Sequence, residues 1–172
     1  MVYRSFMFVT ADQLLCHLVG DYLLQSDWMA TEKTKKWMAC LAHAITYTLP
    51  FLLLTASWKA LLVISASHFI IDHWRLARYL CWIKNYLAPK WIEGEQVETK
   101  EPNTIAGYAD GTTKVLDYKW VPRMIRNYPW SECVATGYHK DRPVWLTVWL
   151  MIITDNTMHF ICNGLALKFL GF

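Results

Sequence analysis

The stretch CHLVGDYLLQSDW (residues 16–28) combines an apolar, helix-forming sequence with evenly spaced polar side chains. His17, Asp21 and Gln25 follow one another at intervals of four residues. In an α-helix this interval places side chains on one face, a single turn apart. The stretch therefore predicts a helix with a polar face in otherwise apolar surroundings.

The His/Asp spacing recurs in two later segments. His68 and Asp72 repeat the order of the first pair, and Asp155 and His159 reverse it. A further histidine, His43, lies in another apolar segment. Four separate segments thus each contribute imidazole or carboxylate groups.

Charged residues avoid two long windows of the 172-residue chain, in which 55% of residues are apolar and 15% aromatic. Residues 38–57 contain no Asp, Glu, Lys or Arg, and residues 143–172 contain only Asp155 and Lys168. A helix of about 20 residues crosses the bilayer core, and residues 5–25 and 60–80 form two weaker windows. This distribution predicts a membrane protein.

The predicted fold is all-α, a four-transmembrane-helix bundle with helices near residues 5–25, 37–56, 58–85 and 144–170. Residues 1–85 hold the first three helices, 86–142 form a polar extramembrane insert, and 143–172 complete the same bundle. In the insert, GYADGTTKVLDYKW (residues 107–120) and MIRNYPWSE (residues 124–132) are compatible with either a hairpin or short helices.

The distribution of Lys and Arg predicts the orientation of such a bundle. Only Arg4, Lys59 and Lys168 would lie on the side of the two termini, and the other 14 of 17 on the side of the insert. By the positive-inside rule the insert is cytoplasmic and both termini face outward. Five scattered cysteines without a CxxC pair argue against a thiolate zinc site. No basic run interleaved with aromatic residues indicates nucleic-acid binding.

Ionisable groups inside a membrane cost at least a few kcal/mol each, so they are expected to face one another in the bundle. Imidazole and carboxylate together suit one or two divalent ions, with zinc, manganese and iron the foremost choices. The predicted ligands are His17, Asp21, His43, His68, Asp72, Asp155 and His159.

An aspartate that does not bind metal would serve as general base, which makes Asp21, Asp72 and Asp155 the candidate catalytic residues. Neighbouring polar side chains would orient the ligands or bind an anionic substrate. These are Gln25, Asn156, Tyr22, Tyr47 and Arg75.

Four motifs, HLVGDYLLQSDWMA, HAITYTL, SHFIIDHWR and DRPVWLTVWLMIITDNTMHF, resemble in order those of an uncharacterised family. Its members are small integral membrane proteins of bacteria and their phages, known as a domain of unknown function. The resemblance covers residues 10–85 and 137–165. It implies a multi-pass protein of the bacterial inner membrane, with His17, Asp21, Gln25 and the other predicted ligands as its polar core. The spans are also distantly similar to inner-membrane metal-dependent hydrolases.

The leading functional hypothesis is a membrane-embedded metal-dependent hydrolase that cleaves a phosphoester or pyrophosphate bond in a lipid or lipid-phosphate head group. One alternative is a cation or proton transporter, or a channel component, acting as a homo-oligomer. Another is a phage-type membrane effector that binds a host membrane protein through the insert.

Overall fold

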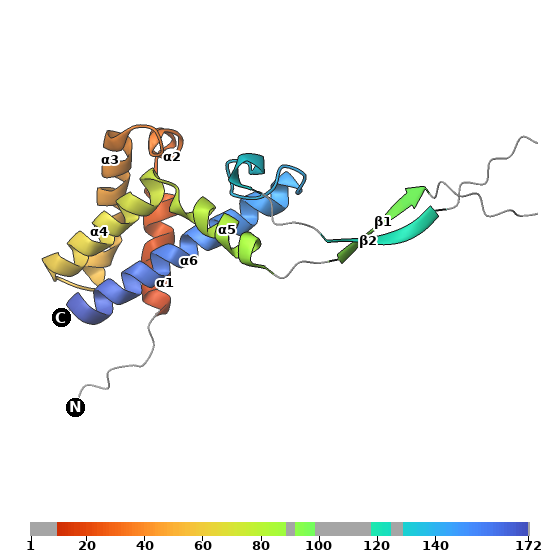
Figure 1. The fold of residues 1–172 in the computed structure, drawn as a ribbon. Coiled ribbons are helices and arrows are strands. Elements are labelled where there is room, and N and C mark those ends of the chain that lie inside the picture. The colour runs from red at the N-terminus through yellow and green to blue at the C-terminus, as the bar shows by residue number, and fades with distance from the viewer. Residues whose placement is uncertain (1–9, 89–91, 99–117, 125–128, 172) are drawn as a thin grey trace, which may run out of the picture.

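The computed structural model describes residues 10–88, 92–98, 118–124 and 129–171, and in them six α-helices form one body (Figure 1). In chain order the helices are α1 (Ala11–Leu18), α2 (Asp27–Glu32), α3 (Trp37–Thr48), α4 (Trp58–His73), α5 (Leu76–Leu87) and α6 (Val144–Leu170). A π-helical turn, Val19–Leu23, continues α1, and a 3-10 turn, Leu49–Leu53, continues α3. A short 3-10 turn, Trp130–Glu132, precedes α6.

The predicted four-span bundle is wrong. Among the described residues only α6 is long and apolar enough to cross a membrane, and its bounds agree with the expected residues 144–170. The apolar helix that begins at Trp37 ends at Leu53, short of the length required. The described residues thus offer one candidate span, and the multi-pass localisation stays a prediction.

The predicted helix over residues 58–85 is interrupted at Arg75, which divides it into α4 and α5. Arg75 has φ 51° and ψ 50°, in the left-handed region of backbone conformation that residues other than glycine rarely adopt. The Arg75 amide donates to the Asp72 carbonyl at 3.1 Å and closes the last turn of α4. The chain therefore changes direction three residues after Asp72.

Over the described residues, the first predicted helix is found from Ala11 to Leu23, and residues 5–9 of the prediction lie outside the described part of the chain. Thr10 caps its start by accepting a hydrogen bond from the Gln13 amide. The π-helical turn lies against α3, where a Cβ on Gly20 would come within 2.7 Å of the Tyr47 carbonyl oxygen. Glycine at position 20 thus permits a close approach of the two backbones.

An apolar core lies at one end of the helical body, where α1, α3, α4 and α6 meet. It consists of Cys16, Tyr47, Phe51, Ile64 and Ala166. A hydrogen bond also joins α1 to α6, since Gln13 Nε2 donates to the Phe160 carbonyl at 3.0 Å. Among the described residues, four histidines and two aspartates are also buried, which is unusual for a protein interior: His17, Asp21, His43, His68, Asp72 and His159.

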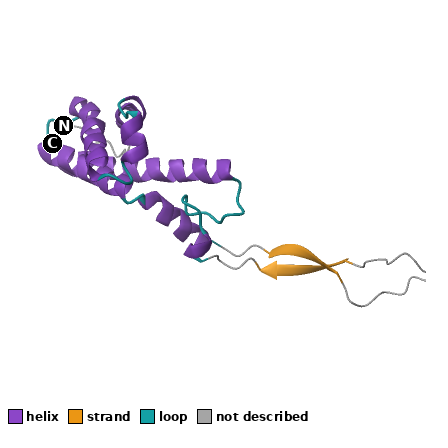
Figure 2. Ribbon diagram, turned by 90° about the horizontal axis from the view of Figure 1, so that it is seen from above, coloured by secondary structure: helices purple, strands orange, loops and turns teal. Residues whose placement is uncertain are grey.

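The polar insert contains an antiparallel hairpin, β1 (Ile92–Glu98) and β2 (Tyr118–Met124), with Ile92 opposite Met124 and Glu98 opposite Tyr118. The hairpin stands apart from the helices in Figures 1 and 2. β1 lies outside the two motifs for which a hairpin or short helices were predicted; only residues 118–120 of the first motif and Met124 of the second belong to β2, and Trp130–Glu132 of the second motif forms the 3-10 turn. Residues 107–117 and 125–128, in the two motifs named above, lie outside the described part of the chain.

The helices carry many large apolar side chains on their outer surfaces. Examples from three elements are Leu53 (86% exposed), Leu87 (74%), Val144 (75%) and Phe169 (70%). Only 17% of the most apolar window of α6 is buried. Large apolar side chains are therefore exposed on several of the helices and not only on α6.

Candidate metal centre

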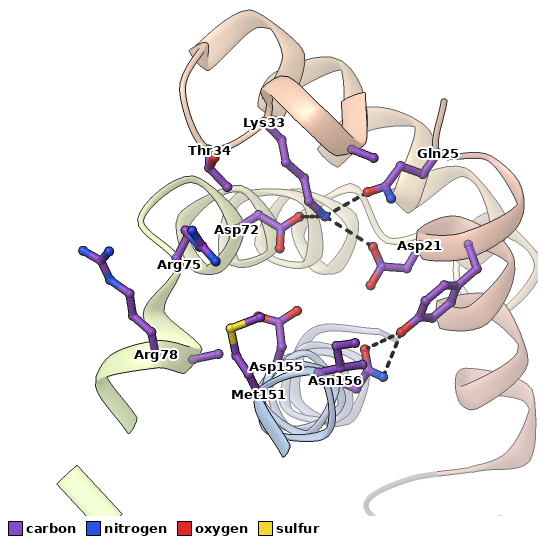
Figure 3. Close-up of a pocket in the computed structure, with 14 residues that line it drawn as sticks. Asp21, Gln25, Lys33, Thr34, Asp72, Arg75, Arg78, Met151, Asp155 and Asn156 are labelled. Carbon is purple, nitrogen blue, oxygen red and sulfur yellow. Dashed lines mark hydrogen bonds and ion pairs between the residues drawn. The ribbon is translucent and has the colours of Figure 1, made fainter. Parts of the chain in front are cut away.

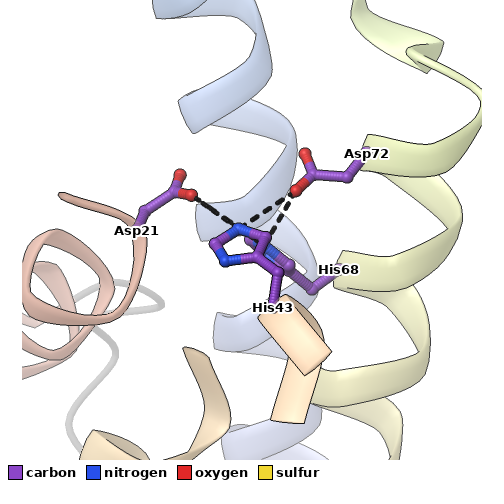
Figure 4. A group of neighbouring side chains, drawn as sticks. All are labelled: Asp21, His43, His68 and Asp72. Carbon is purple, nitrogen blue, oxygen red and sulfur yellow. Dashed lines mark hydrogen bonds and ion pairs between the residues drawn. The ribbon is translucent and has the colours of Figure 1, made fainter. Parts of the chain in front are cut away.

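Four buried side chains from three segments meet at one point (Figure 4). Asp21 comes from the π-helical turn, His43 from α3, and His68 and Asp72 from successive turns of α4. His43 and His68 are fully buried, and the two aspartates nearly so. We call these four residues the four-donor group, since each offers one ligand atom within 4.8 Å of the others.

The donor atoms lie at the spacing that a tetrahedral ion requires. His43 Nε2 is 3.1 Å from Asp21 Oδ1 and 3.2 Å from Asp72 Oδ2. His68 Nε2 is 3.1 Å from Asp72 Oδ2, 3.9 Å from Asp21 Oδ1 and 2.9 Å from His43 Nε2. Four ligands at about 2.0–2.1 Å from zinc are separated from one another by about 3.3–3.4 Å. The observed separations bracket that value, so the four-donor group can hold a metal ion.

The two imidazoles are held by ring packing. His68 stacks between Tyr47, at a centroid distance of 3.6 Å, and His159, at 4.2 Å. The Nδ1 atoms of His43 and His68 are buried and have no hydrogen-bond partner in the described part of the chain. Burial lowers the pKa of His68 to about 3, which leaves the ring neutral, the form that binds metals.

A second set of donors adjoins the first and shares Asp21 with it. It consists of Asp21, Asp155 and His159, whose ligand atoms also lie within 4.8 Å of one another. Asp72 connects the two sets, because its Oδ2 faces His43 and His68 while its Oδ1 is 3.5 Å from His159 Nε2. Carboxylates that face two sets of donors are typical of sites for two ions.

The structure places six of the seven predicted ligands in these two sets and gives His17 other partners. His17 Nδ1 lies 2.8 Å from the Tyr47 hydroxyl and Nε2 lies 3.2 Å from Asn156 Oδ1. Tyr47 also accepts a hydrogen bond from Asn163 Nδ2 at 2.6 Å. His17 Nε2 is also 3.8 Å from Asp21 Oδ2, but His17 belongs to neither set of donors, so its ligand role stays a prediction.

Lys33 is the residue of the site that sequence reasoning did not identify. Its Nζ lies 2.8 Å from Asp72 Oδ2, 3.8 Å from Asp21 Oδ1 and 3.3 Å from His43 Nε2. It also donates to Gln25 Oε1 at 2.8 Å. Lys33 lies in the connection between α2 and α3 with Lys35 and Lys36, and nothing in the sequence distinguishes it from them.

The charges of Lys33 and the two aspartates stabilise one another. Burial raises the pKa of Asp21, but the His43 hydrogen bond and the Lys33 ammonium outweigh it and lower the pKa to about 2. Burial likewise lowers the pKa of Lys33, but Asp72 and Asp21 outweigh it and raise the pKa above its ordinary value. All three groups are therefore charged at neutral pH.

A pocket of about 360 Å³ opens onto both sets of donors (Figure 3). Asp21, Asp72 and Asp155 form its acidic side, and the backbone break places Arg75 on its wall. Of the other predicted polar residues, Gln25, Tyr22 and Asn156 line it too, with Tyr22 and Asn156 bonded to each other at 3.0 Å, whereas Tyr47 does not. The cations along the wall are Lys33, Arg75 and Arg78.

The family described as Protein of unknown function (DUF3307) matches residues 9–98, slightly more than half of the chain. The chain belongs to this DUF3307 family. The matched range contains the four-donor group and Lys33, whereas Asp155 and His159 lie outside it. No curated protein and no solved structure matches the chain.

The DUF3307 match confirms the predicted membership of a family of unknown function over residues 9–98. It does not extend to residues 137–165, the second range of the predicted resemblance. The predicted likeness to membrane-bound metal-dependent hydrolases stays a prediction.

Proposed function

We propose that this DUF3307 protein is a metal-dependent hydrolase that cleaves a phosphoester or pyrophosphate bond in a lipid or lipid-phosphate head group. One observation carries the proposal: a buried set of metal donors and three side-chain cations face the same pocket. The donors suit a divalent ion, and the cations suit an anionic substrate.

The four-donor group would hold one divalent ion, and Asp155 lies outside that group. Nitrogen and carboxylate donors without thiolate suit zinc, manganese or iron. An ion bound here would supply activation of water and neutralisation of phosphate charge. Proton transfer and phosphate binding would be carried out by side chains of the protein.

Asp155 is the carboxylate best placed to accept a proton from water in the pocket. Its side chain is 25% exposed, whereas those of Asp21 and Asp72 are 8% and 3% exposed. Its Oδ2 lies 3.4 Å from His159 Nε2. The imidazole can donate a hydrogen bond to the Asp155 carboxylate before proton transfer and accept one from the Asp155 carboxylic acid afterwards. We therefore assign Asp155 as general base and the two buried aspartates as ligands.

Arg75 and Arg78 would bind the phosphate oxygens. Both line the pocket, and a guanidinium group can donate two parallel hydrogen bonds to a phosphate. One Nη of Arg78 already donates to the Tyr79 hydroxyl at 2.6 Å, which fixes the position of that side chain on α5. Arg75 is held instead by its backbone conformation.

The exposed apolar surface supports a lipid as the source of the phosphate. On α6, Val144, Trp145 and Val148 are exposed and precede the pocket residues Met151 and Ile152 by one to two turns. An acyl or isoprenoid chain could lie along them while its head group enters the pocket. We propose that the protein associates with the membrane through this surface, with α6 as its one candidate span.

The proposal is tested by metal analysis and turnover on protein purified in mild detergent. We expect near-stoichiometric metal in the wild type and phosphate release from lipid phosphates, with metal kept but turnover lost in Asp155→Asn. The exposed Asp27→Asn is the matched control and should behave as wild type. A metal-free wild type would refute the proposal, whereas bound metal with cation flux in liposomes and no turnover would favour the transporter.

A further inference from the structure

An ammonium group lies among the donors of the candidate metal centre. Lys33 Nζ is closer to Asp72 Oδ2 (2.8 Å) than either imidazole nitrogen is (3.2 and 3.1 Å). We propose that Lys33 is an internal competitor of the metal ion: it pairs with Asp21 and Asp72 in the metal-free protein and turns from these carboxylates toward the other side chains of the pocket when metal binds. This inference rests on the proposed metal site.

Charge balance gives Lys33 its role in the metal-free protein. Asp21 and Asp72 place two negative charges in a nearly dry interior, and an unpaired buried charge is strongly destabilising. The Lys33 side chain, itself only 17% exposed, supplies the nearest permanent positive charge. Lys33 thus lets the donors stay together without an ion.

The positive charge of Lys33 also weakens the binding of a metal ion by the four-donor group. Asp72 Oδ2 faces His43, His68 and Lys33 at once, so an ion bound by the two imidazoles and this oxygen would lie within a few ångströms of the ammonium. Like charges at that distance repel strongly at the low effective dielectric constant of a buried site. Metal and Lys33 therefore compete for the carboxylates.

The pocket has room for the Lys33 ammonium group once it has left the aspartates. Lys33 lines the pocket and lies just after α2, a six-residue helix with no buried residues, so its movement leaves the core unchanged. In its present position Lys33 also donates to Gln25, another pocket residue. Released from the aspartates, it would join Arg75 and Arg78 on the pocket wall, so that metal binding frees a third cation for the substrate phosphate.

Zinc affinity tests the competition directly. We expect full-length Lys33→Met to bind Zn²⁺ at least about tenfold more tightly than wild type, measured by competition with a chromophoric chelator. Lys36→Met is the matched control, because Lys36 is 64% exposed and pairs with Glu32 outside the site. Unchanged or weaker zinc binding by Lys33→Met would overturn the inference.

Lysine labelling of the wild type provides a readout that needs no variant to fold. We expect amine-reactive labelling of Lys33 to increase when Zn²⁺ is added, and labelling of Lys36 to stay constant. Zinc binding without that increase would overturn the role of Lys33 and leave the metal site intact. Failure of both wild type and Lys33→Met to bind zinc would overturn the proposed function and this inference together.

Discussion

Substitution of Asp72 by asparagine removes the charge at the centre of the site while keeping its shape. The Asp72 side chain is 3% exposed and contacts Lys33, His43, His68 and His159. Removing one partner of a buried ion pair costs about 3–5 kcal/mol, because the other charge stays behind unpaired. We therefore expect Asp72→Asn to lower the unfolding free energy of the metal-free protein by about that amount.

The unpaired group left behind is the Lys33 ammonium, which retains only the more distant Asp21 at 3.8 Å. A second substitution that removes this charge should therefore recover much of the loss. We expect the double variant Asp72→Asn/Lys33→Met to be more stable than Asp72→Asn, with a coupling free energy of at least about 1 kcal/mol.

The assay is thermal unfolding in mild detergent with a metal chelator present. For a chain of this length a loss of about 3–5 kcal/mol corresponds to a Tm about 6–20 °C lower. Lys36→Met, alone and combined with Asp72→Asn, controls for loss of a lysine at the surface. A cost below about 1 kcal/mol for Asp72→Asn, or a double variant no more stable than that single one, would refute the ion-pair reasoning.

Three further predictions concern the titration of Asp21, the close approach at Gly20 and stabilisation by zinc. The pKa of Asp21 is lowered to about 2 in the folded protein, against about 3.9 in an unfolded chain, so its contribution to the unfolding free energy is complete above about pH 5 and is lost as the pH falls from there toward 2. Unfolding measured from pH 5 to pH 3 should show this loss, and Asp21→Asn should reduce it. Gly20→Ala should cost about 1–3 kcal/mol in thermal unfolding, since its Cβ would collide with the Tyr47 backbone; an unchanged Tm would contradict the close approach. Zn²⁺ at 100 times its Kd should stabilise the wild type by about 2.7 kcal/mol, and should have little effect on His68→Ala.

The regular spacing of residues predicted which helix faces carry polar groups. Side chains four residues apart share a helical face by covalent geometry, so pairs such as His68 and Asp72 could be recognised without a structure. The same holds for α6, whose long apolar run has the observed bounds of residues 144–170. Such features depend on neighbours along the chain.

Features that depend on distant residues were missed or predicted wrongly. The number of candidate spans was overestimated because apolar composition does not show where the backbone breaks, as it does at Arg75. His17 has the same spacing to an aspartate as His68, yet its nitrogens are occupied by Tyr47 and Asn156, from segments 30 and 139 residues away in sequence.

The sequence by itself thus determined the helix faces, the chemical types of the donors and the extent of α6. Only the tertiary structure decided which donors meet, that Lys33 joins them, and that the chain turns at Arg75. The physical reason is that helical periodicity is local, whereas a site is made by helices that pack across long separations in the chain. A lysine in a short connection has no periodicity to reveal it, and its role follows from the carboxylates that folding brings to within 4 Å of its ammonium group.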